Sequence, residues 1–274
     1  MNLDLTETFS GNRAKAGVRL HVGSGAPVSG IIDLAEWGGY RLKFPSSVNQ
    51  LEAVLLNTGG GMAGGDTLDV NVRLNADAAL TVTTQSAERI YRTHGPDTAI
   101  TVELEVGANA NLAFIPQETI LFSHARLSRT ITAEVAQTGQ LLLAEMLVLG
   151  RAASGERITE GALRDRWRIR HGGRLLYADD VRIDGGIADK MDHRAIGAGA
   201  GAAASLIYVA PDAADRLDET RRLMENARCR IAASAWNGVL AVRALGDARH
   251  MRQPFAAIIA GLSRQVLPRV WSGF

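Results

Sequence analysis

The chain of 274 residues has one cysteine, Cys229, and no apolar run long enough to cross a membrane comfortably. One cysteine excludes a disulfide within the chain and is typical of proteins from a reducing compartment. The acidic N-terminal segment lacks the apolar core of a secretory signal peptide. The one long uncharged stretch, residues 195–210, is shorter than a transmembrane helix. We therefore expect a cytoplasmic protein with no membrane partner.

The sequence also lacks a surplus of charge of either sign. It has 30 Lys and Arg against 29 Asp and Glu, and the two signs are interspersed. A nucleic-acid-binding surface needs a basic patch or stripe, so we expect no nucleic-acid partner. Apolar residues make up 46% of the chain, which is enough for a sizeable core. No segment has the composition of a linker, and a single domain over residues 1–274 is predicted.

Signatures of known catalytic and metal sites are missing. The chain contains no H-E-x-x-H, no C-x-x-C and no G-x-S-x-G, and its six histidines do not occur at metal-ligand spacing. Ligands can still converge in space from distant positions. The sequence nevertheless predicts no tightly bound cofactor.

The densest glycine cluster is LLNTGGGMAGGDTL at residues 55–68, which ends near Asp66. Part of it satisfies the dinucleotide pattern G-x-G-x-x-G, which has meaning only when a helix follows and holds the phosphate. Residues 68–74 instead alternate between apolar and polar side chains, which is the period of a strand. We interpret the cluster as a strand–strand connection whose geometry requires glycine, and its motif glycines are Gly59, Gly60, Gly61, Gly64 and Gly65.

Strand patterns dominate from residue 31 to about residue 184. Apolar and polar residues alternate at 40–44, 79–84, 100–106 and 129–135, with turn residues between these segments. Residues 140–149 are almost continuously apolar, as in a strand that is buried on both faces. These patterns predict a mainly β fold of layered β-sheets, either a sandwich or a β-helix-like stack, although no internal sequence repeat is evident.

The C-terminal part of the chain differs, and about two α-helices are predicted there. Pro211-Asp212 and Gln253-Pro254 each place a proline where a first helical turn accepts one. The second helix carries an apolar stripe, interpreted as core packing, and ends before Pro268. The Gly- and Ala-rich segment 195–204 is expected to be a mobile loop or a surface that becomes ordered against a partner.

Three carboxylates occur in unusually apolar surroundings: Glu88, Glu118 and Glu145. A buried carboxylate costs several kcal/mol unless it is paired or binds a cation. Each could pair with an arginine, which is the favoured interpretation, or could face an internal channel and pass a divalent cation. The nearby arginines in the sequence are Arg89, Arg92, Arg126 and Arg151.

The acids between Asp179 and His193 give a second functional hypothesis. They are Asp179, Asp180, Asp184, Asp189 and Asp192. They could hold a metal for a small-molecule hydrolase on a β-sandwich, but their spacing matches no EF-hand, and solvated acids in turns are the commoner case.

Six segments in this order resemble the urease accessory protein UreD family, called UreH in some organisms. They are NTGGGMAGGDTL, TTQSAERIYR, PQETILFSHARL, LVLGRAASGE, DRWRIRHGGRLLYAD and PRVW. The resemblance implies a non-enzymatic, β-rich scaffold with two helices that acts in the maturation of nickel urease. It also implies binding to the urease apoprotein and to a UreF-type partner, and through UreF to the UreG-type GTPase that carries nickel.

The resemblance further implies an internal passage that leads nickel toward the urease active site. Carried over by motif, Asp66 and Glu88 are the candidate passage residues, and the second motif also contains Arg89 and Tyr91. Oxygen ligands suit transient Ni²⁺, because a passage must bind weakly enough to release its cargo. Asp66 could instead cap its own turn. Weaker candidates for the passage are Glu118, Glu145 and Glu156, whereas His124 and segment 195–204 match nothing in the family pattern.

Overall fold

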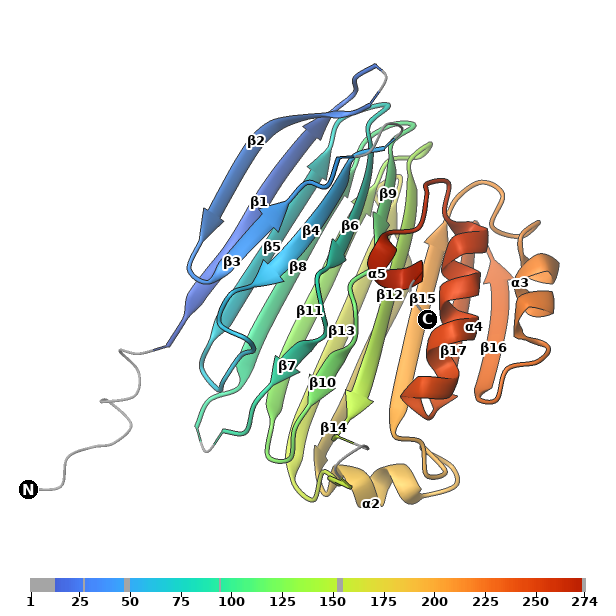
Figure 1. The fold of residues 1–274 in the computed structure, drawn as a ribbon. Coiled ribbons are helices and arrows are strands. Elements are labelled where there is room, and N and C mark those ends of the chain that lie inside the picture. The colour runs from blue at the N-terminus through green and yellow to red at the C-terminus, as the bar shows by residue number, and fades with distance from the viewer. Residues whose placement is uncertain (1–12, 27, 47–49, 94, 152–154, 273–274) are drawn as a thin grey trace, which may run out of the picture.

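The computed structural model describes residues 13–26, 28–46, 50–93, 95–151 and 155–272. Two β-sheets lie face to face (Figure 1). Within the described residues, sheet A has seven strands in the order β14-β13-β11-β8-β5-β1-β2. Their bounds are β1 (Lys15–Gly23), β2 (Gly30–Trp37), β5 (Thr67–Leu74), β8 (Thr98–Val106), β11 (Arg126–Val135), β13 (Gly161–His171) and β14 (Arg174–Gly185).

The described part of sheet B has ten strands. Eight follow the order β16-β17-β15-β12-β9-β6-β4-β3, and β7 and β10 extend it beside β12. Their bounds are β3 (Tyr40–Lys43), β4 (Glu52–Asn57), β6 (Ala79–Thr84), β7 (Glu88–Ile90), β9 (Asn111–Phe114), β10 (Thr119–Leu121), β12 (Gln140–Leu149), β15 (Ala202–Val209), β16 (Arg230–Trp236) and β17 (Val239–Gly246).

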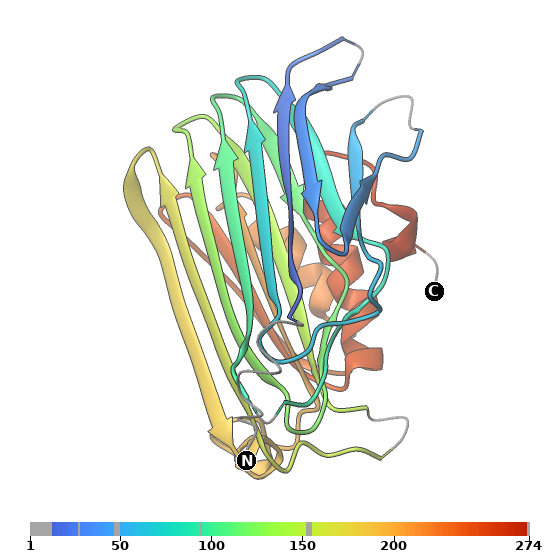
Figure 2. The ribbon, with the colours of Figure 1, turned by 90° about the vertical axis from the view of Figure 1, so that its left-hand side faces the viewer.

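The middle of the chain winds between the two sheets in solenoid-like coils (Figure 2). Strands β5, β8, β11 and β13 pair in parallel in sheet A, while β4, β6, β9 and β12 do so in sheet B. Parallel neighbours need a crossover connection, and here each crossover includes a strand of the opposite sheet. The fold is therefore mainly β and stacked, as the strand pattern predicted.

The main core lies between the sheets. Sheet A contributes residues such as Val70, Val102 and Ile131, and sheet B contributes Leu80 and Leu112, all of them buried. A second cluster covers the other face of sheet B. Strand β12 lies between the two clusters and is buried on both faces, so the prediction from its continuous apolar run is confirmed.

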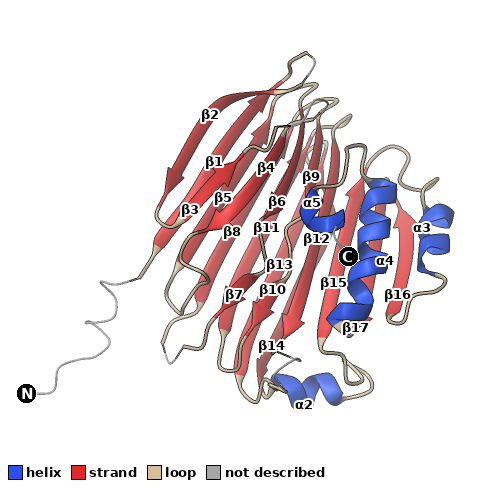
Figure 3. Cartoon of the chain, viewed as in Figure 1, coloured by secondary structure: helices blue, strands red, loops and turns tan. Residues whose placement is uncertain are grey.

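Among the described residues, the helices are α2 (Ile187–Asp192), α3 (Leu217–Met224), α4 (Ala248–Leu262) and α5 (Arg269–Ser272), shown in Figure 3. Helix α4 packs its apolar stripe, including Phe255 and Ile258, on the outer face of sheet B. None of the described helices combines the length and the apolar composition needed to cross a membrane.

Both predicted helix starts were wrong. Helix α3 begins at Leu217, because residues 211–216 form turns after Pro211. Helix α4 begins at Ala248, where the Asp247 side chain accepts a hydrogen bond from the backbone N–H of Arg249, and Pro254 lies inside the helix. The start signal was therefore the N-cap aspartate rather than the proline. The short helices α2 and α5 were not predicted.

Segment 195–204 is only partly a loop. Its last residues begin β15, where Ala202 and Ala204 lie opposite Val148 and Met146 of β12 and are buried. Alanine suits this position, because α4 packs on the same face of sheet B. The prediction of a mobile loop or partner surface is therefore wrong for residues 202–204.

Candidate functional site

A cluster of three charged side chains lies inside the molecule, between the sheets. Arg129 of β11 and Asp165 of β13 are register partners in sheet A, and Glu145 of β12 faces them from sheet B. Their side chains are only 2%, 8% and 6% exposed, respectively. The strand period explains this placement, since Arg129 and Asp165 occupy positions whose neighbours on the same face are apolar and buried.

Arg129 holds the cluster together. Its Nε lies 3.1 Å from Asp165 Oδ1 and its Nη2 lies 2.6 Å from Asp165 Oδ2. Its Nη1 donates to Glu145 Oε2 and, at 3.4 Å, to the hydroxyl of Thr119. Trp167 Nε1 donates to Asp165 Oδ1 at 3.0 Å. The buried charges are therefore paired and hydrogen-bonded, as their burial requires.

Burial shifts the protonation of this cluster. Loss of solvation raises the pKa of Glu145 to about 7, with Arg129 opposing the shift and Asp165 adding to it. Burial alone would lower the pKa of Arg129, but the two carboxylates raise it above its ordinary value. The two carboxylates thus keep Arg129 charged, whereas burial favours the protonated form of Glu145.

The cluster borders an interior cavity of about 270 Å³. Apolar side chains such as Leu163, Ile183 and Leu245 form most of its wall. At the polar end, the guanidinium of Arg243 donates to Asp179 and, at 3.0 Å, to the hydroxyl of Ser205. Ile196, which also lines the cavity, is 50% exposed.

Glu88 lies at the far end of the same inner surface. In sheet B, Glu88 of β7 is the register partner of Thr119 of β10, which in turn lies beside Leu147 of β12. The Glu88 carboxylate accepts from the Tyr40 hydroxyl at 2.6 Å and from the Asn57 amide at 2.9 Å.

Burial dominates the protonation of this pair as well. It raises the pKa of Glu88, while the hydrogen bonds from Tyr40 and Asn57 act in the opposite direction. It also raises the pKa of the Tyr40 hydroxyl, and the neighbouring Glu88 carboxylate adds to that rise.

Polar side chains on the inner face of sheet B lie in two register rows, because the partner of Thr119 on β12 is Leu147 rather than Glu145. Arg129 joins the two rows, since its Nη1 donates to Thr119 and to Glu145. Register pairs extend the row from Glu145 to Ser205 of β15 and from Ser205 to Arg243 of β17. Alternation along each strand places these side chains on the face that carries the main core. We define the polar row as Glu88, Thr119, Glu145, Ser205 and Arg243.

Asp66 closes the turn of the glycine segment. Its Oδ1 accepts from the backbone N–H of Ala14 at 2.9 Å, and its Oδ2 accepts from that of Ala63 at 2.7 Å. An aspartate that caps its own turn makes contacts of this kind. Turn capping was the alternative to a role for Asp66 in the nickel passage.

Two of the motif glycines are required by close approach. A Cβ at Gly61, where φ is +149°, would meet the Tyr91 ring and lie 2.8 Å from the carbonyl oxygen of Arg89. At Gly64, a Cβ would collide with Thr93. The segment connects β4 to β5, so its interpretation as a strand–strand connection is confirmed.

A family model described as "UreD urease accessory protein" matches residues 13–272. "Urease accessory protein UreD 1" of Methylobacterium radiotolerans is 49% identical over 265 residues, which cover 94% of this chain and 92% of the relative. The chain belongs to the UreD family. "Urease accessory protein UreD 2" of Methylorubrum populi is 47% identical over 271 residues, which cover 96% and 91% of the two chains.

Membership of the UreD family confirms the resemblance drawn from the six segments. It also decides the functional class, because UreD proteins are accessory factors in urease maturation and not enzymes. The acids of the hydrolase hypothesis do not converge either. Four of these acids lie along β14 and α2, and each pairs with its own cationic side chain. They are Asp179 with Arg243, Asp180 with Arg166, Asp184 with Lys190, and Asp192 with Arg157.

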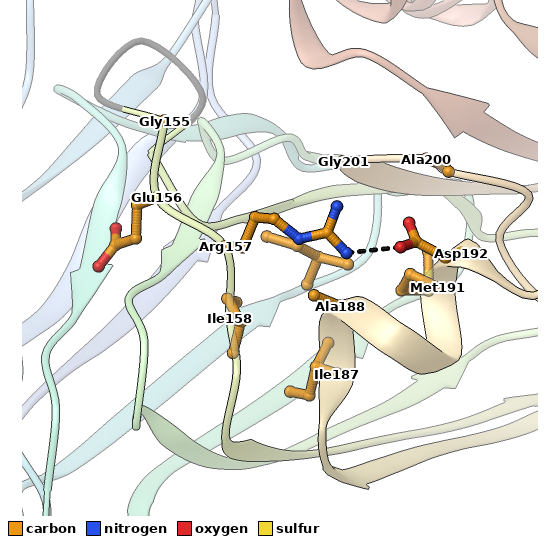
Figure 4. A pocket seen from close by; sticks show the side chains of 12 residues that line it. Gly155, Glu156, Arg157, Ile158, Ile187, Ala188, Met191, Asp192, Ala200 and Gly201 are labelled. Atoms are coloured by element: carbon orange, nitrogen blue, oxygen red, sulfur yellow. Dashed lines mark hydrogen bonds and ion pairs between the residues drawn. The ribbon is translucent and has the colours of Figure 1, made fainter.

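The remaining two candidate carboxylates are both paired with arginine. Glu118 accepts from Arg252 of α4, whose guanidinium also lies 5.0 Å from the centre of the Trp271 ring. Glu156 accepts from Arg151 at 2.9 Å, and this hydrogen bond lowers the pKa of Glu156. Glu156 lines a second cavity of about 250 Å³, shown in Figure 4.

The prediction that Glu118 and Glu145 each pair with an arginine is confirmed, but neither partner is one of the four arginines that the sequence suggested. Arg252 and Arg129 are the partners, while Glu88 is held by a tyrosine and an asparagine. Partners across the sheets cannot be located from proximity in the sequence. One signal could have found Arg129 and Asp165, since each interrupts the apolar face of an alternating strand.

The five candidate carboxylates do not form one coordination site. Among the described residues, no three His, Cys, Asp or Glu side chains gather in a way that could hold a metal ion. Glu88 and Glu145 lie on the polar row, Glu156 lines the second cavity, and Asp66 and Glu118 make separate contacts.

Proposed function

We propose that this chain is a scaffold for the maturation of nickel urease in the cytoplasm. In this proposal it binds the urease apoprotein and a UreF-type protein, and through the latter a UreG-type GTPase. It helps to deliver nickel to the urease active site through its own interior. Family membership and the names of its relatives support the maturation role.

The polar row is the observation that supports an interior route. An apolar core normally excludes charged groups, yet the inner face of sheet B carries Glu88 on β7, Glu145 on β12 and Arg243 on β17. One end of the row borders the interior cavity. A cation in this cavity would meet oxygen donors at Asp179, Ser205 and Glu145.

The chemistry of the row suits cargo that must be released. Carboxylate and hydroxyl oxygens attract Ni²⁺, but a passage has to bind its cargo weakly. Arg129 supplies that weakness, because its guanidinium already occupies the Glu145 and Asp165 oxygens. A cation at Glu145 would displace either the Glu145 proton or the hydrogen bond from Arg129.

The other candidate carboxylates take different places in the proposal. Glu88 would be an interior contact on the route, held in position by Tyr40 and Asn57. Glu156 would form part of the wall of the second cavity, with its carboxylate held by Arg151. Asp66 has both carboxylate oxygens engaged by backbone N–H groups, so we assign it first to the turn and only second to the route.

Co-purification tests the scaffold role. The tagged chain is expressed with the urease subunits and the UreF-type protein of the same organism, and the masses of the complexes are measured by light scattering. We expect the chain to elute with both partners, and a UreG-type GTPase to join only when the UreF-type protein is present. A folded chain that elutes alone under these conditions would contradict the proposal.

A further inference from the structure

The two cavities meet at the same pair of side chains. Leu149 and Met191 line both the interior cavity beside Glu145 and the second cavity beside Glu156. Figure 4 shows Met191 on α2, facing the second cavity next to Ala188 and Asp192. Asp192 lines the second cavity on one side of these two residues, and Glu145 lines the interior cavity on the other side.

Leu149 forms the fixed wall of this junction. It ends β12, where it pairs with Leu121 of β10, and its backbone N–H donates to the carbonyl of Gly201 at 2.8 Å. Strand pairing on both sides therefore holds its backbone in place.

Met191 forms the adaptable wall. It lies on α2, a helix of six residues, and its unbranched side chain has three rotatable bonds. Gly197 packs directly against it, since a Cβ there would lie 2.7 Å from Met191 Cε. Glycine at position 197 therefore allows the end of Met191 to pack against the backbone, where any side chain would collide with it.

We infer that Leu149 and Met191 form the constriction of a single route that joins the second cavity to the interior carboxylates. Met191 controls its width. This inference rests on the proposed delivery of nickel through the interior, and it adds the second cavity as one mouth of the route. Asp192, paired with Arg157, lies at that mouth (Figure 4), and Glu145 lies beyond the constriction.

An apolar constriction blocks a hydrated cation by excluding its water, and it opens when the side chain moves aside. The Met191 thioether is a soft, weak donor that does not retain a cation which prefers nitrogen and oxygen ligands. Met191 therefore acts by its position and its mobility, and the carboxylates on either side supply the attraction.

The test narrows the constriction from each wall separately. Met191→Phe and Leu149→Phe place a rigid ring in the junction. The matched control is Leu175→Phe, which places the same ring at a side chain that is 53% exposed and is not among the lining residues of either cavity. Each variant is assembled with the urease apoprotein, the UreF-type protein and the UreG-type GTPase. We then measure complex formation, the nickel content of urease and the rate at which urease activity appears.

Both Phe variants should assemble normally but transfer nickel about tenfold more slowly, which is the effect of about 1.4 kcal/mol of added barrier. Leu175→Phe should transfer at the unmodified rate. If either Phe variant fails to fold, the other decides the question. Normal transfer by an assembled Phe variant would overturn the constriction.

The same measurement on Glu145→Gln distinguishes a failure of the constriction from a failure of the proposed interior route. Slow transfer by Glu145→Gln together with normal transfer by both Phe variants would reject the constriction alone. Normal transfer by all three variants would reject the interior route itself.

Discussion

Arg129 and Asp165 form a two-point ion pair inside the molecule, with Nε 3.1 Å from Oδ1 and Nη2 2.6 Å from Oδ2. Replacing Arg129 by methionine would leave two buried carboxylates without their cation. We expect Arg129→Met to lower the free energy of unfolding by about 3–5 kcal/mol. Urea unfolding followed by circular dichroism measures this loss.

The matched control is Arg73→Met, which breaks a cross-strand pair on the surface. Arg73 and Glu105 lie 3.4 Å apart, and both side chains are more than 60% exposed. The loss there should be below about 1 kcal/mol. Equal effects of the two substitutions would show that burial of Arg129 does not set its contribution.

Glu145 should make stability depend on pH. Its pKa is raised from 4.5 to about 7 by burial, so the folded chain holds a proton there that the unfolded chain releases near pH 4.5. Its contribution is therefore most favourable at low pH and decreases as the pH rises toward 7. Glu145→Gln removes this titration.

The measurement is the difference in free energy of unfolding between the unmodified chain and Glu145→Gln across the mildly acidic to neutral range. The difference should fall by a few kcal/mol as the pH rises. A difference that increases with pH would mean that pairing with Arg129 outweighs burial and that Glu145 stays ionised.

Tyr40 should hold Glu88 in position at the far end of the polar row. Tyr40→Phe removes the hydroxyl that donates to Glu88 and accepts from Asn57. We expect a loss of about 1–3 kcal/mol in the free energy of unfolding, because buried polar groups lose a partner. The pKa of Glu88 should also rise further, since this hydrogen bond lowers it.

Tyr91→Phe is the control for that substitution, because the Tyr91 hydroxyl donates to the carbonyl of Gly60 in an exposed hydrogen bond of 2.9 Å. Its loss should be about 1 kcal/mol or less. Larger destabilisation by Tyr91→Phe than by Tyr40→Phe would contradict the assigned role of Tyr40.

Two glycines of the motif should respond differently to alanine. At Gly64 a Cβ would collide with Thr93 and lie 2.6 Å from the carbonyl oxygen of Pro96, so we expect Gly64→Ala to cost about 3 kcal/mol. At Gly60 a Cβ would meet open space, and only the positive φ of 76° disfavours a side chain. We expect Gly60→Ala to cost about 1–2 kcal/mol. Thermal unfolding of both variants tests this order.

The strands could be predicted from the sequence because each one shows its burial pattern in its own residues. The alternation at β5 and the continuous apolar run of β12 reflect local burial, and each segment shows it without knowledge of its neighbours. The helix starts were harder to predict. Pro211 and Pro254 are compatible with a first helical turn, so they predict helix starts, whereas the helices begin at Leu217 and Ala248.

The candidate site could be predicted only in part. Glu88 and Glu145 were found because charged residues stand out in apolar segments. Their partners Tyr40 and Arg129 were not predicted, because contacts between the sheets or between distant strands do not occur at a fixed spacing in the sequence. The polar row exists only through the register of neighbouring strands, which a single sequence does not contain.

The most direct test of nickel delivery through the interior compares Glu145→Gln with Glu105→Gln, the same change at an exposed position of sheet A. Each chain is assembled with the urease apoprotein and its partners, and the nickel content of the resulting urease is measured by mass spectrometry. Glu145→Gln should form the complex yet load nickel about tenfold more slowly, while Glu105→Gln should load it normally. Normal loading by an assembled Glu145→Gln complex would contradict the interior route.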